Sequence, residues 1–404
     1  MPESPFSPSS GQAPPLLAGR DKELQSCREL FSRSGSVGNI LVTGLHGLGK
    51  TSLLGELKVI AQKEKWFWVG SDLSQNGPLT EEDLARRILK DIAVSMSAAD
   101  GVNSGGTLED LTSNYNSSPG LVVDKLKSVF QSLSSTHIAA NYKGILLAYD
   151  EAHLLCDPPA KESFCLPLLV ELVNAFQKQE TATAVHLVLS GLPHLFDEIT
   201  SGQSYAERMF HLMPLYRLTP KDTEAAIKVP LERIGQADRC PTGLIKNAIE
   251  YSGGYPCFIQ FFGDELYRAL SRKGTELETM IFPDLDVWNK LDGGSFTERW
   301  GRLSDKERAF LGKIVNVIGR NDLEFSIEEL STHISGSQGV HQENEIDVPQ
   351  MLELLRQKGL VYPKRPGCYA LATPMTETLV MLRFRQQPGS RLKSWFSRSR
   401  SRAV

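Results

Sequence analysis

Three features that would assign a protein to a specialised class are missing from this sequence. No apolar stretch reaches the length of a transmembrane helix, because the run over residues 164–176 is interrupted by Pro167 and Glu171. The six cysteines include no C-x-x-C pair and no zinc-ligand spacing, so we expect reduced, structural thiols. The net charge of −4 gives the whole chain no general attraction to nucleic acid or membranes. The amino terminus also lacks the basic start of a secretory signal, and we expect a cytoplasmic protein.

What remains is typical of a multidomain globular protein. The chain has 404 residues, of which 41% are hydrophobic and 23% charged. Such a length allows two or three domains and a large core. Five short apolar runs alternate with helical patterns and predict strands at residues 39–42, 66–70, 144–149, 184–189 and 215–218. This alternation indicates a doubly wound α/β layer with a parallel sheet.

One glycine-rich stretch carries the clearest chemical signal. It follows the first predicted strand, opens a helix and matches the pattern G-x-x-x-x-G-K-[ST]. Main-chain N–H groups of such a loop face an anion, Lys50 reaches the β- and γ-phosphates, and the Thr51 hydroxyl is a ligand for Mg²⁺. The predicted nucleotide-binding residues are Gly44, Leu45, His46, Gly47, Leu48, Gly49, Lys50, Thr51 and Ser52.

Two acids at the end of the buried strand 144–149 predict the other half of a nucleotide site. Asp150 at the strand tip can hold Mg²⁺ through a water, and Glu151 can orient or deprotonate the attacking water. Ser190 ends the neighbouring strand, where it contacts the γ-phosphate or the lytic water, or merely starts a turn with Gly191. His46 and His153 lie in or beside the two motifs without the spacing of metal ligands, and we expect spectator roles for both.

Arg208 precedes the last predicted strand, and two interpretations of it stay open. It can stabilise transition-state charge in a neighbouring subunit across an oligomer interface, or it can be a solvated surface residue. The catalytic candidates are therefore Lys50, Glu151, Ser190 and Arg208, with Thr51 and Asp150 as metal ligands.

These motifs together resemble the origin-recognition-like AAA+ ATPases and the bacterial STAND-type signalling ATPases. The resemblance covers residues 16–385 and includes the entry at Arg20–Glu23, Ser190-Gly191 and Gly254-Tyr255-Pro256. It implies ATP or ADP with Mg²⁺ as ligands and the sheet order 5-1-4-3-2. It also implies that Gly19 and Arg20 line the adenine pocket and that Pro256 in a helical lid senses the nucleotide. From composition alone, Gly19-Arg20 is a turn before a helix, and Cys257 is a buried apolar residue.

The fold class we expect is a P-loop, AAA+-like parallel sheet with a helical lid, followed by a winged-helix domain. Residues 1–15, rich in Pro, Ser and Gly, and the basic tail 385–404 are predicted to be disordered. The α/β core takes residues 16–220 with a flexible insertion at 95–120, the lid and connector 221–295, and the winged helix 296–384.

The winged helix leaves its partner open between a protein and duplex DNA. Its third helix offers Gln350, Glu353, Arg356, Gln357 and Lys358, a mixed rather than basic face. The tail, with Trp395 and Phe396 among its arginines, suits nucleic acid, an anionic surface or plain solvent.

The function we expect is a slowly hydrolysing ATPase that switches what the winged helix presents, with self-association through the ATPase domain. The alternatives are a DNA-bound loader or transposition helper and a nucleotide-holding scaffold without turnover.

Overall fold

The structure is a computed structural model, and it divides the chain into two units, Met1–Leu277 and Glu278–Val404. The residues it describes are 3–8, 13–33, 38–73, 80–100, 107–133, 140–155, 165–178, 184–201, 206–272, 277, 283, 286–287, 290, 300–318, 324–336, 347–358, 360–365, 367–371 and 376–385. The connector at 275–295 lies almost wholly outside these ranges, and the basic tail lies outside them from residue 386.

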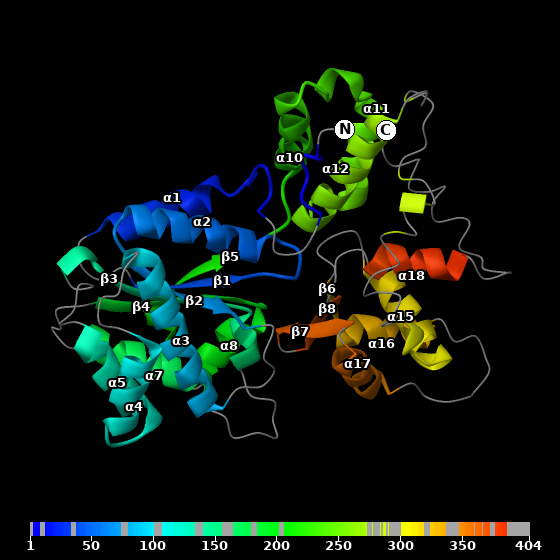
Figure 1. The fold of residues 1–404 in the computed structure, drawn as a ribbon. Coiled ribbons are helices and arrows are strands. Elements are labelled where there is room, and N and C mark those ends of the chain that lie inside the picture. Colours follow the sequence, from blue (N-terminus) through cyan, green and yellow to red (C-terminus); the bar gives the residue numbers. More distant parts are fainter. Residues whose placement is uncertain are drawn as a thin grey trace. The chain divides into compact units, whose positions relative to one another are not determined.

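A five-stranded parallel sheet forms the centre of the first unit (Figure 1). Its order, β2-β3-β4-β1-β5, is the order 5-1-4-3-2 implied by the resemblance and read from the other edge. The strands are β1 (Asn39–Thr43), β2 (Phe67–Asp72), β3 (Gly144–Asp150), β4 (Ala184–Gly191) and β5 (Phe210–Pro214). All pairings are parallel, so the carboxyl ends of the strands share one edge of the sheet.

Helices cover both faces of this sheet (Figure 1). One layer contains α1 (Asp21–Ser32) and α2 (Lys50–Lys63), and the other contains α3 (Glu81–Asp100), α5 (Val122–Leu133) and α7 (Cys165–Lys178). Every residue of β1 and β3 is buried, which is why these strands read as continuous apolar runs in the sequence. The α/β fold class predicted from the sequence is confirmed.

The position predicted for the fifth strand is wrong by five residues. β5 is Phe210–Pro214, whereas the sequence favoured residues 215–218. β5 lies at the edge of the sheet, and only Phe210 and Met213 in it are buried. A half-exposed edge strand has a weak apolar signal, and the alternating segment after it, which contains the exposed Tyr216, was mistaken for it.

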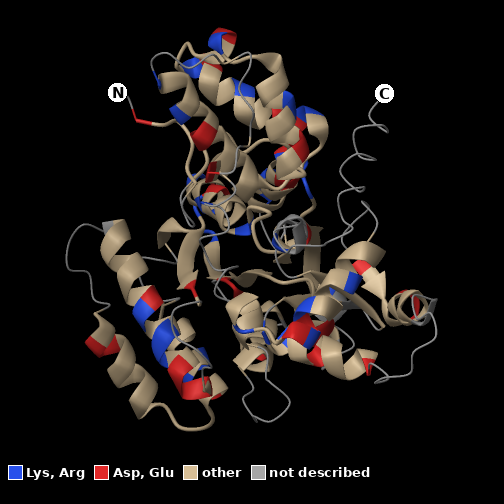
Figure 2. Cartoon of the chain, turned by 90° about the vertical axis from the view of Figure 1, so that its right-hand side faces the viewer, with Lys and Arg blue, Asp and Glu red and all other residues tan. Residues whose placement is uncertain are grey.

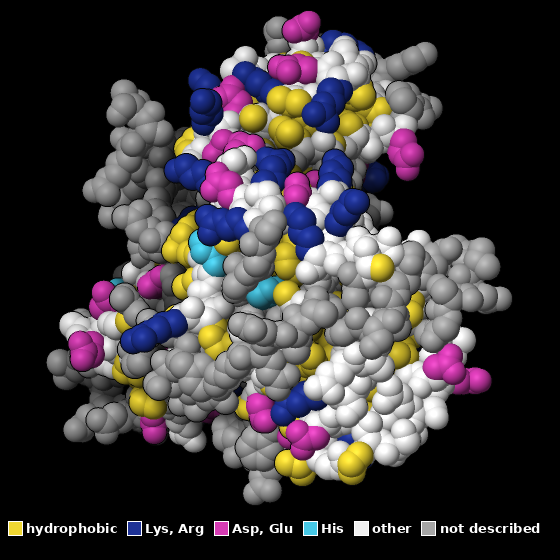
Figure 3. All heavy atoms as spheres, turned by 90° about the vertical axis from the view of Figure 1, so that its left-hand side faces the viewer, with side chains coloured by type: hydrophobic (Ala, Val, Ile, Leu, Met, Phe, Trp, Pro, Cys, Tyr) yellow, Lys and Arg dark blue, Asp and Glu magenta, His cyan; other side chains and the backbone are white. Residues whose placement is uncertain are grey.

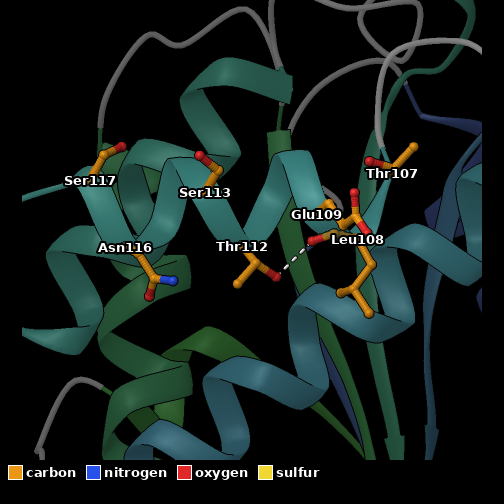
Figure 4. A pocket seen from close by; sticks show the side chains of 7 residues that line it. All are labelled: Thr107, Leu108, Glu109, Thr112, Ser113, Asn116 and Ser117. Carbon is orange, nitrogen blue, oxygen red and sulfur yellow. Dashed lines mark hydrogen bonds between the residues drawn. The ribbon is translucent and has the colours of Figure 1, made fainter.

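The flexible insertion predicted at 95–120 is also corrected. Helix α3 continues to Asp100, and a further helix, α4 (Leu108–Ser117), begins with a capping box of Thr107 and Asp110. Leu111 and Tyr115, one helical turn apart, are buried. A composition rich in Ser and Asn concealed this pair. The outer side of α4 lines a shallow, open depression, in which Thr112 donates a hydrogen bond to the Leu108 carbonyl (Figure 4).

Three helices form the predicted lid, namely α10 (Pro220–Arg233), α11 (Thr242–Ser252) and α12 (Pro256–Ser271). The amino-terminal segment lies against them, which corrects the expectation of disorder for the described part of residues 1–15. Phe6 is 4% exposed, and a Cβ on Gly263 of α12 would lie 2.5 Å from its ring. The amide of Ser7 donates to Gln260, and Arg233 donates to the Pro15 carbonyl. The segment was predicted to be disordered from its average composition, which does not reveal that a single aromatic residue, Phe6, is buried.

The second unit has the element order of a winged helix. A helix is followed by a strand, two helices and two further strands, α15 (Asp305–Val317), β6 (Glu324–Ser326), α16 (Ile327–Gly336), α17 (Val348–Gln357), β7 (Val361–Arg365) and β8 (Cys368–Leu371). A capping box of Ser304 and Glu307 opens α15. The sheet has three strands in the order β6-β8-β7. Helix α18 (Thr376–Arg385) was not anticipated.

Two general expectations can be compared with the described residues. Every helix in this part of the chain is too short or too polar to span a lipid bilayer. The described cysteines all have free thiols, and Cys27, Cys165 and Cys240 are buried.

Candidate functional site

The glycine-rich loop connects β1 to α2 in the way that a phosphate-binding loop requires. Gly47 and Gly49 have φ angles of 81° and 87°, a left-handed region that side chains other than hydrogen rarely adopt. Gly49 is the residue before α2, so the first N–H groups of that helix have no acceptor within the helix and point into the loop. Leu45 and Leu48 are buried beneath the loop and anchor it. The loop is therefore preformed for an anion.

Lys50 is held at the centre of this loop. Its Nζ donates to the carbonyl oxygens of Gly44 at 3.1 Å and Leu45 at 3.3 Å. Burial lowers the pKa of Lys50, while the nearby Glu151 and Asp150 carboxylates oppose that shift. A buried ammonium whose hydrogen-bond partners are neutral carbonyls is well placed to turn to an anionic phosphate.

Asp150 joins the two sequence motifs. Its Oδ2 accepts a hydrogen bond from Thr51 Oγ1 at 2.6 Å, and its Oδ1 accepts from Ser190 Oγ at 2.7 Å and from the Glu151 amide at 2.9 Å. The side chain is buried and oriented by all three donors. Thr51 and Asp150 thus offer two oxygen atoms 2.6 Å apart, and oxygen atoms are the ligands that Mg²⁺ prefers.

Ser190 lies at the end of the strand beside β3, as expected, and contacts Asp150. It is fully buried at the end of β4, and its hydroxyl proton is used on Asp150. This hydrogen bond orients the Asp150 carboxylate, and the expected contact of Ser190 with the γ-phosphate or the lytic water stays a prediction. Tyr149 of β3 pairs with Leu189 of β4, so the next residues on the two strands, Asp150 and Ser190, lie side by side.

Glu151 follows Asp150 with an unusual backbone conformation. Its φ is 54°, in the left-handed region, where a side chain costs free energy unless its surroundings hold it. Burial raises the pKa of the Glu151 carboxyl, and the Lys50 ammonium opposes this shift. The side chain is thus a partly desolvated carboxyl that faces the loop lysine.

Gly19 and Arg20 reach the loop from the amino-terminal side. The Arg20 guanidinium donates to the carbonyl oxygens of Leu48 at 3.0 Å and Tyr216 at 2.7 Å. Burial lowers the pKa of Arg20, with opposing effects of Glu23 and Asp222. Arg20 is therefore a latch between the loop and the segment that leads into the lid, and its predicted contact with adenine stays a prediction.

Pro256 meets the loop from the lid. A Cβ on Gly49 would lie 3.9 Å from Pro256 Cγ, and the Cys257 amide donates to the Gly47 carbonyl at 3.2 Å. The first turn of α12 thus rests on the phosphate-binding loop itself. Cys257 is exposed, so its interpretation as a buried apolar residue is wrong. A nucleotide-sensing role for Pro256 stays a prediction.

Arg208 is not brought to the site of its own chain. It is exposed in α9 (Ala206–Met209), immediately before β5. Phe210 pairs with Asn39 at the amino end of β1, whereas the loop follows Thr43 at the carboxyl end. Arg208 therefore lies at the opposite edge of the sheet, and both interpretations, a role in trans and a solvated surface residue, stay open.

Sequence reasoning missed one participant and could have found it. His153 lies with its Nδ1 3.2 Å from Glu151 Oε2, and its ring contacts those of His46 and His194 edge-on. The signal was available, because His153 follows the acid pair closely and His194 follows the neighbouring strand, whose carboxyl end shares the same edge. From the sequence we expected a spectator role for His153 and did not consider His194, because we did not compare residues that follow neighbouring strands.

A triphosphate with Mg²⁺ is compatible with these residues. The loop supplies main-chain donors and a buried ammonium, while Thr51 and Asp150 supply the oxygen atoms for a hard cation. The same edge also presents the Glu151 carboxyl group. Only the backbone amide of Glu151 donates a hydrogen bond to Asp150, and the carboxyl group takes no part in it.

Comparison with known proteins agrees with this geometry. Residues 16–175 match the family described as AAA ATPase domain. Among solved structures, the Walker-type ATPase paby2304 of Pyrococcus abyssi is 17% identical over 90% of this chain and 96% of that chain, with a TM-score of 0.57. The Aeropyrum pernix ORC2 protein in ADPNP-ADP complexes is 15% identical over 94% and 98%, with a TM-score of 0.53. No curated protein sequence matches the chain.

Identities this low show a shared fold alone, and both structural likenesses extend over nearly the whole chain. The family match covers the loop, β3 and the acid pair that the geometry brings together. Residues 16–175 are therefore similar in sequence to the AAA ATPase domain family.

Proposed function

We propose that this protein is a slowly hydrolysing ATPase whose nucleotide state sets the lid and, through it, the winged-helix domain. The AAA ATPase match supports nucleotide binding and hydrolysis in general. The specific role as a switch is supported by one observation, the hydrogen bond from the Cys257 amide at the start of α12 to the Gly47 carbonyl of the loop. A phosphate that changes the conformation of the loop also changes the contact between the loop and the first turn of α12.

The chemistry can be assigned to named groups of this chain. Main-chain amides of the loop and the Lys50 ammonium bind the phosphates, and Thr51 and Asp150 hold the metal. Bound Mg²⁺ neutralises charge on the phosphate oxygens. Glu151 orients the attacking water and takes its proton, and a pKa raised by burial improves it as a base near neutral pH. Ser190 fixes the orientation of the Asp150 carboxylate.

The charges of the winged helix favour a protein partner over duplex DNA. On α17, Arg356 makes two hydrogen bonds of 2.7 Å to Glu353, and these hold the pKa of Glu353 at about 2. Lys358 is bound to Glu307 at 2.6 Å. Cations already paired within the domain have less to offer to phosphates. Basic and acidic segments are interspersed along the helices in Figure 2.

Hydrolysis is tested with phosphate release from the parent and two variants. Lys50→Ala is expected to lose the thermal shift induced by ATP or ADP. Glu151→Gln is expected to keep that shift and to hydrolyse about 10²–10⁴-fold more slowly, the usual contribution of a general base. Equal phosphate release from the parent and Glu151→Gln would instead support the scaffold without turnover.

The switch is tested with hydrogen exchange in the ATP- and ADP-bound states. The first turn of α12 is expected to exchange differently in the two states, because its Cys257 amide bonds to the loop. Helix α11, which makes no such bond in the described structure, serves as the internal control. A change in α15–α18 must accompany the change in α12, and its absence would contradict control of the winged helix.

The DNA-loader alternative has its own test. Exposed basic residues on α1, α2 and α10 are Lys22, Arg28, Lys58, Lys63, Lys221 and Arg233, and Figure 3 shows Lys and Arg side chains gathered across one face of the molecule. Salt-dependent binding of duplex DNA would favour this alternative. Loss of that binding on removal of residues 386–404 would assign it to the basic tail, and retention would assign it to the folded surface.

A further inference from the structure

His153 is fixed in position by the turn that follows the acid pair. It belongs to the short 3₁₀ helix Ala152–Leu155, whose flanking residues Ala152 and Leu155 are buried. The Leu154 amide donates to the Glu151 carbonyl at 2.9 Å and closes this turn. The side chain of His153 is only 12% exposed. Its place beside Glu151 is therefore set by local structure rather than by a mobile surface rotamer.

The imidazole of His153 lies beside the Glu151 carboxyl. Nδ1 of His153 lies 3.2 Å from Oε2 of Glu151. Both atoms are shielded from solvent, and within the described part of the chain neither makes a hydrogen bond, with the other or with any third group. A buried polar atom without a hydrogen-bond partner is destabilising, so a small rotation that aligns the two groups is favoured.

The His153 ring is packed between Gly191 and two other histidines. A Cβ on Gly191 would lie 3.4 Å from Nδ1 and 3.2 Å from the His153 amide, so the glycine makes the space that the ring fills. The rings of His46 and His194 flank it with centroids at 6.2 Å and 5.8 Å and interplanar angles of 71° and 83°. Burial, followed by these two histidines, lowers the pKa of His153 to about 3, which leaves a neutral ring that can donate one N–H.

A metal site does not explain this group of histidines. Within the described residues, no three His, Cys, Asp or Glu side chains are arranged to hold a metal ion. The feature that does need explanation is Glu151, whose left-handed φ of 54° must be held by its surroundings. The carboxyl has the Lys50 ammonium as an electrostatic neighbour as well as the imidazole.

We propose that His153 is a positioning residue for Glu151, whose Oε2 it holds by a neutral N–H so that Oε1 is left to orient the attacking water. The proposal rests on the proposed function, in which Glu151 is the general base. His153 touches neither nucleotide nor water in this role. Its effect is to select one rotamer of the carboxyl and to stabilise the strained backbone beneath it.

The test is a double-mutant cycle of ATP hydrolysis with Glu151→Gln and His153→Ala. His153→Ala alone is expected to lower kcat about 10–100-fold, the usual effect of removing a group that orients a reactive one, with an unchanged KM for ATP. In the Glu151→Gln background the same change is expected to have no further effect. His153→Asn, whose amide can replace the Nδ1 donor, is expected to recover most of the activity.

Two further variants separate positioning from general destabilisation. Gly191→Ala keeps His153 but adds a Cβ that would lie 2.7 Å from Leu195 Cδ2 and 3.2 Å from the His153 amide, so one of these neighbours must shift, and the variant is expected to have a lower kcat and an unchanged KM. His186→Gln alters a histidine of β4 that is 1% exposed and bonded to Gln177, and its kcat is expected to equal that of the parent.

The outcomes distinguish the proposal from the function on which it rests. Full activity of His153→Ala, an equal loss in the Glu151→Gln background, or a raised KM would overturn the positioning role while leaving Glu151 as base. If His153→Ala does not fold, His153→Asn and Gly191→Ala decide the question. An inactive His153→Asn together with an unchanged kcat in Gly191→Ala would also overturn the positioning role. Parent-like hydrolysis by Glu151→Gln would instead overturn the proposed base.

Discussion

Thr51 Oγ1 donates a hydrogen bond to Asp150 Oδ2 at 2.6 Å, although the two residues are 99 positions apart in the sequence. This contact joins the phosphate-binding loop to the acid pair and makes one site of two motifs. It arises because β3 and β1 belong to one parallel sheet, with β4 between them, so their carboxyl ends meet at one edge. The same edge places Ser190 against the other oxygen of Asp150.

The Ser190 hydroxyl should affect metal binding rather than nucleotide binding. Ser190→Ala removes a donor to Asp150 Oδ1 and loosens the carboxylate that is proposed to hold Mg²⁺. We expect the Mg²⁺ concentration for half-maximal hydrolysis to rise about 10–100-fold, as is typical when an orienting partner of a metal ligand is lost. Ser252→Ala, which removes an equally buried hydroxyl bonded to Ile249, is the control. An unchanged Mg²⁺ titration in Ser190→Ala would contradict this role.

The amino-terminal segment should detach from the lid when its aromatic anchor or the space for it is removed. Phe6→Ala deletes the ring, and Gly263→Ala adds a Cβ that would lie 2.5 Å from it. Burial of a phenylalanine is worth about 1.5–3 kcal/mol, so proteolysis ahead of residue 13 should be about 10- to 150-fold faster in both variants.

A matched glycine provides the control for this prediction. A Cβ on Gly243 in α11 meets nothing within 4 Å, so Gly243→Ala should leave the cleavage rate unchanged. Cleavage of Gly263→Ala at the rate of the parent would show that the Phe6 contact does not hold the segment.

Arg208 should act, if at all, in the site of another copy of the chain. It is exposed at the edge of the sheet opposite its own loop. Arg208→Ala is expected to lower hydrolysis on the order of 10³-fold in an oligomer, as for other arginines that act in trans. Mixing Arg208→Ala with Glu151→Gln, each inactive alone, should restore activity, since the first supplies an intact site and the second the arginine. Inactive mixtures of correctly assembled oligomers would rule out this arrangement.

His186 should make the protein less stable toward acid. Burial lowers its pKa from 6.5 to about 4 in the folded chain. Between these values the unfolded chain binds the proton more readily, so the free energy of unfolding falls as the pH drops below 6.5 and levels off below about 4. The full effect is at most about 3 kcal/mol, from about 1.36 kcal/mol per unit of pKa.

Urea unfolding measured between pH 7 and pH 4 tests this slope. His186→Gln should flatten it, whereas the same change at the exposed His211 should not. A parent-like slope in His186→Gln would assign the acid sensitivity to other groups.

Local sequence signals succeeded where one element carries its own evidence. Three elements could be predicted from a few neighbouring residues each. They are the glycine-rich loop and the buried strands β1 and β3. Local signals failed where burial depends on a distant partner. Tyr115 is buried because α3 and α5 lie beside α4. Phe6 is buried because Gly263, 257 positions later in the sequence, leaves room for its ring.

The sequence by itself determined that a phosphate-binding loop and an acid pair are present, because a loop of fixed length and a strand tip need only neighbouring residues to form. The tertiary structure decided what these residues touch: Ser190 turns to Asp150, Cys257 rests on the loop, and His153 lies against Glu151. The reason is that the order of strands in the sheet and the packing of the lid bring distant segments together, and such contacts leave no periodicity in the chain to be read.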